Sequence, residues 1–371
     1  MNNLSNYSNN QIKDALFFKD GVRNISFKYD LMDLNDIKIG ELDGITGKVS
    51  FGEFRTIKRS ATFQLNEYLQ KEINYFTDQI QPWFILHMPD GGAVEWPLGI
   101  FMLESPNRIT KDHISTREIG AYDKTLVIEE DKFMNRYFIA SGANYVGAIV
   151  RILNETGITK VSITSSNFSL SSEREFSIGT KKKEAINDLL QEINYTSIGV
   201  DENGYFFSRP YIEPAYRPVT HEYNEEKNSI FHPEYTENLE IAGRANVFIR
   251  IAMDLTNEQE YVSQFINDDI LSPLSTVNRG RHIVDFEEVD GIANQTVLDD
   301  FVKRIAIEST SAYSHLTFDT ALIPTHGSAE TLYLNIPSVF DTPQLFSETS
   351  WDMDLTYDGK MKHEARKVVY L

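Results

Sequence analysis

Apolar and polar side chains alternate along much of the first third of the chain, and this alternation predicts β-strands. Phe63 and Leu65 are in phase with one another, and Thr62, Gln64 and Asn66 occupy the opposite phase. The segment Pro-Asp-Gly-Gly between two such runs predicts a tight hairpin turn. Strands at short spacing joined by Gly, Asp and Pro turns predict a sandwich or a barrel.

The pattern changes to a helical period after about residue 125, which predicts a small α+β domain in the middle of the chain. Two helices with an apolar face are predicted, one that stops at Gly157 and one that begins within the stretch SIGTKKKEAINDLL. The faces consist of Val146, Ile149, Val150 and Leu153 in the first helix, and of Ala185, Ile186, Leu189, Leu190 and Ile193 in the second. Asn203-Gly204 predicts a hairpin turn between two strands of this domain.

β-type alternation returns in the last third, with one helical segment inserted. Residues 216–235 are rich in Pro, Glu and Asn and predict a crossover. A helix over about residues 292–311 is predicted, with an apolar face of Val297, Leu298, Phe301, Ile305 and Ile307. We therefore expect a mainly β chain with three domains: a β domain over 1–125, an α+β domain and crossover over 126–235, and a second β domain over 236–371.

Aromatic side chains within the first β domain are expected to fill its core and not to form a sugar-stacking platform. Each of them falls within a β run at a position that we predict to face inward: Phe63, Trp83, Trp96, Phe101 and Tyr122.

Composition narrows the classes of function. The chain has 371 residues, with 35 basic and 55 acidic side chains and a formal net charge of −20. Such a surface lacks the basic footprint of a sequence-specific nucleic-acid binder, although DNA could pass through a channel in it. Cysteine is absent from the sequence, which removes disulfides, thiolate zinc sites and cysteine nucleophiles. With a polar N-terminus and no long apolar run, we expect a soluble chain made in a cytoplasm, without membrane insertion.

The stretch SIGTKKKEAINDLL, residues 177–190, has the strand, glycine turn and helix of a phosphate-binding loop. The loop motif, however, requires a second glycine, followed by Lys and then Ser or Thr. Here Thr180 precedes the lysines. We therefore expect Thr180 to be a helix N-cap, and Lys183 and Glu184 to begin an exposed face of a scaffold helix.

Metal and acid–base motifs are equally incomplete. A cluster of acids at 285–290 resembles the start of a calcium-binding loop, but its glycine falls one position late. The twelfth position, which needs a bidentate acid, is Thr296. We therefore expect a solvated acidic turn. The histidines are scattered without a His-Glu-x-x-His pair, and we expect surface or hydrogen-bonded side chains. Acid pairs are common in so acidic a chain, and no cofactor, metal or catalytic site is predicted. The residues considered are Asp285, Glu287, Glu288 and Asp290; His221, His232, His282, His315 and His326; and Glu173 with Glu175.

The order of the β runs resembles that of phage and prophage tail hub proteins, the baseplate hubs of siphophage and contractile tails. The resemblance begins at about residue 25 and extends over nearly the whole chain. The stretches that carry it include GELDGITGKVSFGEFRTIKRSATFQL, EWPLGIFMLESP, REFSIGTKKKEAINDLLQEINYTSIGVDENGYF, LSPLSTVNRGRHIV and SWDMDLTYDGKMKHEARKVVYL.

This resemblance implies two tail-tube-like antiparallel β-barrels with small α+β domains attached. It implies a homotrimer that joins the sixfold tail tube to a threefold tail tip and forms part of the DNA channel. The expected partners are a distal tail or tail-tube protein, and a fibre, spike or tape-measure protein; the expected location is the virion tail, after synthesis in the bacterial host cytoplasm. The expected role is non-enzymatic. The alternative is a tail-carried carbohydrate-active protein, a wall hydrolase or receptor-binding module, with a cleft where acids and aromatic rings converge.

Overall fold

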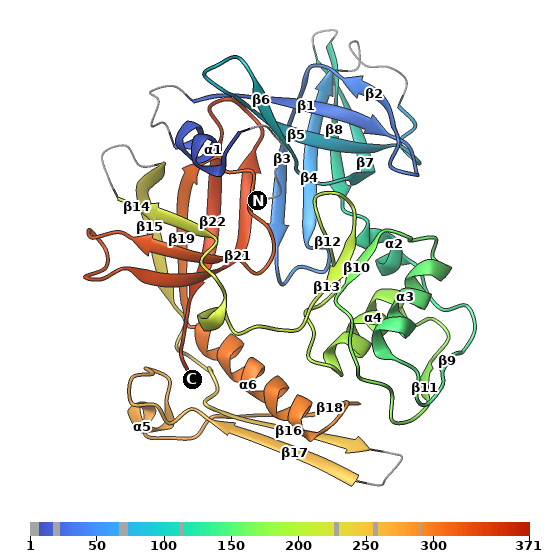
Figure 1. Cartoon of the computed structure of the whole chain (residues 1–371), viewed down its shortest axis with the longest axis vertical. Helices are drawn as coiled ribbons and strands as arrows, with labels where there is room; N and C mark the ends of the chain where they lie inside the picture. The colour runs from blue at the N-terminus through green and yellow to red at the C-terminus, as the bar shows by residue number, and fades with distance from the viewer. Residues whose placement is uncertain are drawn as a thin grey trace.

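The structure is a computed structural model that describes residues 7–17, 23–66, 73–111, 114–225, 230–254, 259–289 and 291–371. Its described strands form one large sheet of 14 strands and three small sheets. Figure 1 shows the large sheet curving through the upper half of the molecule, with two small mixed units beneath it. The chain is therefore mainly β, as predicted.

The first half of the large sheet is built from the N-terminal third of the chain. Its ladders are antiparallel, and the order along the sheet is β3-β4-β8-β7-β5-β1-β2, with β6 on β5. The strands are β1 (Asn24–Met32), β2 (Lys38–Leu42), β3 (Ile45–Gly52), β4 (Arg59–Asn66), β5 (Gln79–His87), β6 (Ala93–Pro97), β7 (Phe101–Lys111) and β8 (Ile114–Tyr122). The hairpin predicted at Pro-Asp-Gly-Gly is confirmed between β5 and β6, where Gly91 has a φ of 89°.

The second half is built from the last third of the chain and from a segment near residue 225. Its order is β15-β19-β22-β21, and β20 and β14 continue from β21 on a side branch. The strands are β14 (His221–Asn224), β15 (Phe231–Leu239), β19 (Ser314–Ala321), β20 (Thr331–Asn335), β21 (Gln344–Asp354) and β22 (Lys360–Lys367). The segment 216–235, predicted as a crossover, thus contains β14 and the start of β15, because these residues add to edges of the sheet.

Pairing between β3 and β21 joins the two halves into one sheet. Trp351 is the register partner of Phe51, and the two rings stack with centroids 5.9 Å apart. A single cluster of buried apolar side chains contains members from both halves, including Phe63, Phe84 and Phe318. Among the described strands the path is open between β15 and β2, so closure into two barrels stays a prediction.

The middle of the chain forms a separate α+β unit with its own core. It contains α2 (Thr125–Glu130), β9 (Tyr137–Ile139), α3 (Tyr145–Glu155), β10 (Val161–Ile163), β11 (Arg174–Phe176), α4 (Lys182–Gln191), β12 (Gly199–Val200) and β13 (Phe206–Ser208). The predicted faces of α3 and α4 pack in this core, where Ile149, Ile186 and Leu190 are fully buried. The hairpin at Asn203-Gly204 is confirmed between β12 and β13.

A second small unit follows β15. It contains β16 (Val247–Asp254), β17 (Gln259–Ile266), α5 (Thr276–Arg279), β18 (Val284–Val289) and α6 (Gln295–Ser311). α6 is the helix predicted over 292–311, and it packs on one face of the sheet β17-β16-β18. The division of the chain at residues 125 and 235 stays a prediction.

Two short helices complete the fold. α1 (Asn9–Leu16) packs its buried side chains into the core of the large sheet and has a capping box between Ser8 and Gln11. The sequence Ser-Asn-Asn-Gln is the signal for this box, and it could have been recognised. η2 (Pro214–Tyr216) precedes β14.

The aromatic residues predicted for the first core divide by strand phase. Phe63, Trp96 and Phe101 are buried, as predicted. Trp83 and Tyr122 are only half-buried, so their prediction was wrong. Their strand neighbours Phe84 and Ala121 occupy the inward phase, and successive side chains of a strand point to opposite faces.

Candidate functional site at the junction of the units

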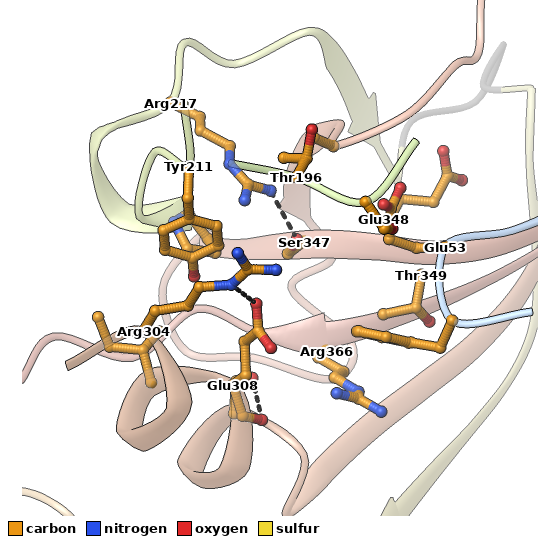
Figure 2. A pocket seen from close by; sticks show the side chains of 16 residues that line it. Glu53, Thr196, Tyr211, Arg217, Arg304, Glu308, Ser347, Glu348, Thr349 and Arg366 are labelled. Carbon is orange, nitrogen blue, oxygen red and sulfur yellow. Dashed lines mark hydrogen bonds and ion pairs between the residues drawn. The ribbon is translucent and has the colours of Figure 1, made fainter. Parts of the chain in front are cut away.

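A cavity of about 140 Å³ lies where the large sheet, the α+β unit and α6 meet. We call it the junction cavity (Figure 2). β21 and β22 contribute one wall, and the opposite wall comes from α6 and the segment before β14. The polar side chains that line it are Glu53, Thr196, Ser197, Tyr211, Arg217, Arg304, Glu308, Ser311, Ser347, Glu348, Thr349 and Arg366.

The acids of the junction cavity already have partners. Arg304 Nε lies 2.9 Å from Glu308 Oε1, one turn along α6. Lys58 Nζ lies 2.5 Å from Glu53 Oε1, and the Ser328 hydroxyl donates to Glu53 at 2.7 Å. Burial would raise the pKa of the Glu53 carboxyl, but Lys58 and Ser328 hold it below its usual range. Glu53 and Glu308 are therefore each held by a basic neighbour.

Two guanidinium groups at the cavity differ from Arg304. Arg217 donates to Ile212 O at 2.8 Å and to Ser347 Oγ at 3.4 Å, and Arg366 lies over the Phe54 ring, 4.4 Å from its centroid. In the part of the chain that the structure describes, neither guanidinium forms a salt bridge with a carboxylate. Burial lowers the pKa of both groups. The buried Tyr211 hydroxyl also has no hydrogen-bond partner among the described residues.

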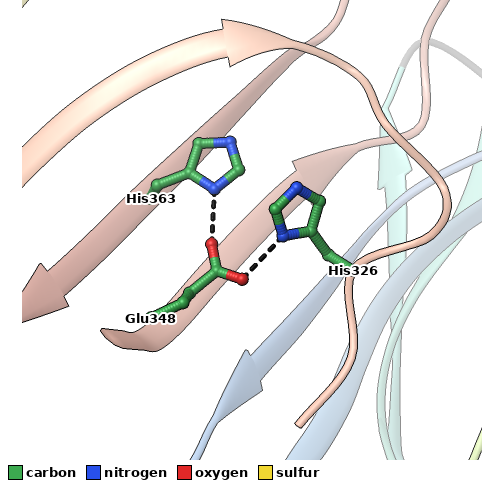
Figure 3. Close-up of side chains that lie close together, drawn as sticks. All are labelled: His326, Glu348 and His363. Carbon is green, nitrogen blue, oxygen red and sulfur yellow. Dashed lines mark hydrogen bonds and ion pairs between the residues drawn. The ribbon is translucent and has the colours of Figure 1, made fainter. Parts of the chain in front are cut away.

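A buried network of histidines surrounds the cavity residue Glu348 (Figure 3). Its two carboxylate oxygens accept from His363 Nδ1 and His326 Nδ1, each at 2.6 Å. The far nitrogen of His326 lies 2.7 Å from the Tyr223 hydroxyl, and that of His363 lies 2.8 Å from Thr320 Oγ1. All five side chains are buried, so the network closes on itself inside the second half of the sheet.

The network is anionic at its centre. Burial opposes ionisation of Glu348, but the two imidazoles stabilise its carboxylate and lower its pKa to about 2. Burial lowers the pKa of His326 to about 4, although Glu348 acts in the opposite direction. The His221 ring stacks on His326 with centroids 3.7 Å apart. The arrangement holds one negative charge between imidazoles at neutral pH.

His326, Glu348 and His363 are also the ligand types that Zn²⁺ prefers, and their donor atoms lie within 4.8 Å of one another. Each ring nitrogen and each carboxylate oxygen of these three residues already has a hydrogen-bond partner. Buried polar groups of this kind are satisfied without an ion. We therefore assign the network a structural role in the core.

The histidine predictions are confirmed in part. His326 is hydrogen-bonded, as predicted, and His221 lies 3.0 Å from Thr325 Oγ1. The expectation that the histidines are scattered was wrong for this pair, because β14 pairs with β20 and brings them together. His315 lies 3.7 Å from Glu364, His282 is exposed and His232 is half-buried.

Sequence reasoning missed His363 and Glu348. His363 is in phase with Met361 and Ala365 on β22, and all three side chains are buried. A histidine in the buried phase of a strand predicts a buried polar partner. The identity of that partner depends on the neighbouring strand, which the sequence of β22 does not contain.

The three lysines of α4 make structural contacts. Thr180 is not the N-cap: Lys181 occupies that position, without a side-chain cap. Lys181 and Lys183 pair with Glu129 of α2, and Lys182 Nζ lies 2.6 Å from Asp131. Lys183 is buried and donates to Thr56 O in the connection between β3 and β4. The predicted exposed face was therefore wrong at Lys183, because the helix packs against the first half of the sheet there.

The acidic run after residue 284 is also corrected. It forms β18 and not a turn, and Asp285 and Glu287 lie 3.0 and 3.2 Å from Arg250 nitrogens. Asp290 lies outside the described residues. Glu173 and Glu175 are exposed, and Glu175 pairs with Arg136 at 3.1 Å. Within the described ranges, no helix combines the length and the apolarity needed to cross a bilayer.

Solved structures of several tail proteins have this architecture. No family model and no curated protein matches the sequence. A tail protein from Neisseria meningitidis MC58 has the same fold, with a TM-score of 0.67, 7% identity, and coverage of 92% of this chain and 97% of that one. The 43 kDa tail protein of prophage MuSo2 from Shewanella oneidensis gives a TM-score of 0.62, with 9% identity over 91% and 98% of the chains.

The prophage tail protein gp18 from Listeria monocytogenes EGD-e gives a TM-score of 0.58, with 10% identity over 91% and 94% of the chains. The alignments cover nearly the whole length of each protein, so both halves of the large sheet and the attached units are shared. The resemblance to tail proteins is confirmed at the level of fold. The chain therefore has the fold of phage and prophage tail proteins.

Proposed function

We propose that this protein is a structural, non-enzymatic component of a phage or prophage tail, the baseplate hub. In this role three copies form a ring that joins the sixfold tail tube to the threefold tail tip. The ring surrounds part of the channel through which DNA passes, and it is located in the virion tail.

The observation that carries the proposal is the match of the complete architecture. Tail proteins from three bacterial sources align over 91–92% of this chain and at least 94% of their own. The net charge of −20 suits a channel, because carboxylates along a lumen repel the phosphates of passing DNA. The proposed partners are a distal tail or tail-tube protein on one side and a fibre, spike or tape-measure protein on the other.

Edges of the large sheet are the proposed contact sites between copies. β2 and β15 lie at the two ends of its path. Ile39 of β2 is 51% exposed, and Ile37 just before the strand is 59% exposed. An unpaired edge strand is a template for another chain, and closing a ring is one way to cover it. Each copy would then present one edge and receive a different one, as a cyclic trimer requires.

The carbohydrate-active alternative is less well supported. Acids and aromatic rings do meet at the junction cavity, where Glu53 and Glu308 lie near Phe54 and Tyr211. A glycosidase needs a general acid with a raised pKa. The pKa values of Glu53 and Glu348 are lowered, and Glu308 is paired with Arg304. The chemistry of the cavity therefore favours a structural junction.

Mass measurement in solution tests the proposal. We expect the chain to be a monomer at micromolar concentration and to form a trimer with its neighbouring tail proteins, because tail components assemble on a nucleating partner. Turnover of cell-wall polysaccharide by the purified chain, lost on substitution of Glu53 or Glu308, would instead support the alternative.

A further inference from the structure

We propose that the junction cavity is a binding site for a small tetrahedral oxyanion of the phosphate class. Two guanidinium groups at the cavity, those of Arg217 and Arg366, form no salt bridge with a carboxylate among the described residues. The buried Tyr211 hydroxyl beside them has no hydrogen-bond partner among these residues. This inference is independent of the proposed tail function.

The donor set fits an oxyanion. Arg217 and Arg366 carry planar guanidinium groups, which bind phosphate oxygens in a fork geometry. Arg366 Nε is buried without a hydrogen-bond partner in the described chain, and so is the Tyr211 hydroxyl. Such unsatisfied donors each cost free energy that a bound anion would recover. The hydroxyls of Ser347 and Thr349 line the same space.

The anions already present do not complete the site. Glu308 is engaged by Arg304, Glu53 by Lys58 and Ser328, and Glu348 by His326 and His363. Glu53 and Glu308 stabilise the charge of Arg217 only at longer range, and Glu308 does the same for Arg366. Within the described residues, neither guanidinium has a carboxylate at salt-bridge distance.

The size of the cavity limits the ligand. Its volume of about 140 Å³ exceeds what one water molecule needs. It is smaller than the roughly 300–1,000 Å³ typical of sites for drug-sized ligands. A free inorganic ion therefore fits better than a nucleotide or a sugar. The net charge of the chain opposes anion approach, so the local donors have to provide the affinity.

The experiment is a titration of the full chain with inorganic phosphate at constant ionic strength, followed by calorimetry and by the shift in melting temperature. We expect a dissociation constant below about 1 mM. A parallel titration with acetate tests whether the site binds carboxylates instead. We expect acetate to bind at least tenfold more weakly than phosphate, because acetate has fewer acceptor oxygens. Equal affinity for acetate would overturn the phosphate assignment.

Three variants locate the site. Arg217→Gln and Arg366→Gln should each weaken phosphate binding about tenfold or more, equivalent to at least about 1.4 kcal/mol. Tyr211→Phe removes only a hydroxyl that has no partner in the described chain. This variant should therefore fold as well as the wild type while binding phosphate several-fold more weakly, which separates loss of the site from loss of the fold.

Matched controls are exposed side chains that do not line the cavity. Arg136→Gln removes an exposed guanidinium that pairs with Glu175, and Tyr357→Phe removes a hydroxyl from a side chain that is 83% exposed. Both should bind phosphate like the wild type. Absence of phosphate binding by the wild type, or equal binding by wild type and all three cavity variants, overturns the proposal.

Discussion

At the scale of single residues, the structure depends on a carboxylate that is held in the core by two imidazoles. Glu348 is 3% exposed, and its oxygens accept from His326 and His363. A buried charge is tolerated when it is paired and hydrogen-bonded, and removal of one partner leaves the rest unsatisfied. The network therefore connects β14, β19, β21 and β22 through side chains as well as through ladders.

Acid should weaken this network. The pKa of His326 is lowered to about 4 by burial, whereas an unfolded histidine titrates near 6.5. The unfolded chain thus binds the proton first, and stability falls as the pH drops from about 6.5 to 4, by roughly 3 kcal/mol. Glu348, with a pKa lowered to about 2, extends the loss below about pH 4.5. Urea unfolding at a series of pH values measures the slope.

The variant His326→Gln provides the control for this slope. It lacks the imidazole, so its free energy of unfolding should be lower than that of the wild type at pH 7, with a difference that shrinks toward pH 4. Parallel pH profiles for the two proteins would show that His326 does not cause the acid sensitivity.

Buried aromatic residues of the first core support a second prediction. Phe101 is fully buried, 6.0 Å from the Phe63 ring, and Trp96 packs edge-on against Phe84 at 5.9 Å. Trp96→Ala and Phe101→Ala should each lower the free energy of unfolding by about 3–5 kcal/mol. Phe76→Ala is the control, because Phe76 is 96% exposed and its loss should cost less than about 0.5 kcal/mol. If all three variants had the same free energy of unfolding as the wild type, Trp96 and Phe101 would lie outside the core.

At the scale of elements, α4 connects the α+β unit to the large sheet. Lys183 lies on the first turn of the helix and reaches both Glu129 of α2 and Thr56 O. Burial lowers the pKa of its ammonium, and Glu129 acts against that effect. The lysine is therefore part of a buried contact between two units.

Lys183→Gln should destabilise this contact by roughly 1–3 kcal/mol, since a buried hydrogen-bonded charge is lost and Thr56 O loses its donor. Lys360→Gln, at an exposed position on β22, serves as the control. Denaturant unfolding compares the two variants. If Lys183→Gln were as stable as the control, the contact between α4 and the sheet would contribute nothing measurable.

Most elements could be predicted from local patterns, and the errors have a common cause. The period of α3, α4 and α6 and the turns at Gly91 and Gly204 are local features, and they are confirmed. β14 and β18 were missed because each depends on a partner strand far along the chain for its burial and hydrogen bonds. The buried position of Lys183 and the partners of His363 depend in the same way on tertiary contacts.

At the scale of the whole molecule, one continuous sheet carries both halves of the chain. The pairing of β3 with β21 joins residues about 300 positions apart, and local sequence patterns contain no signal for such a pair. The junction cavity is lined by residues far apart in the sequence, among them Glu53, Tyr211 and Arg366. The site was therefore beyond prediction from the sequence, although the resemblance to tail hub proteins gave the class of fold.

Salt should promote assembly of the whole molecule. Three copies with a net charge of −20 each repel one another. Salt weakens this repulsion, since the Debye screening length falls to about 10 Å at 0.1 M ionic strength. We expect sedimentation to show a shift from monomer toward trimer as the salt concentration rises. A stable dimer across the whole salt series would contradict a cyclic threefold assembly.

Electron microscopy of tails assembled by co-expression with the neighbouring tail proteins tests the proposed hub role. We expect three copies in a ring around an open axial channel, placed between the tail tube and the tail tip, with each copy fitting the fold in Figure 1. Tails that lack a threefold ring of this chain at that position would rule the hub role out.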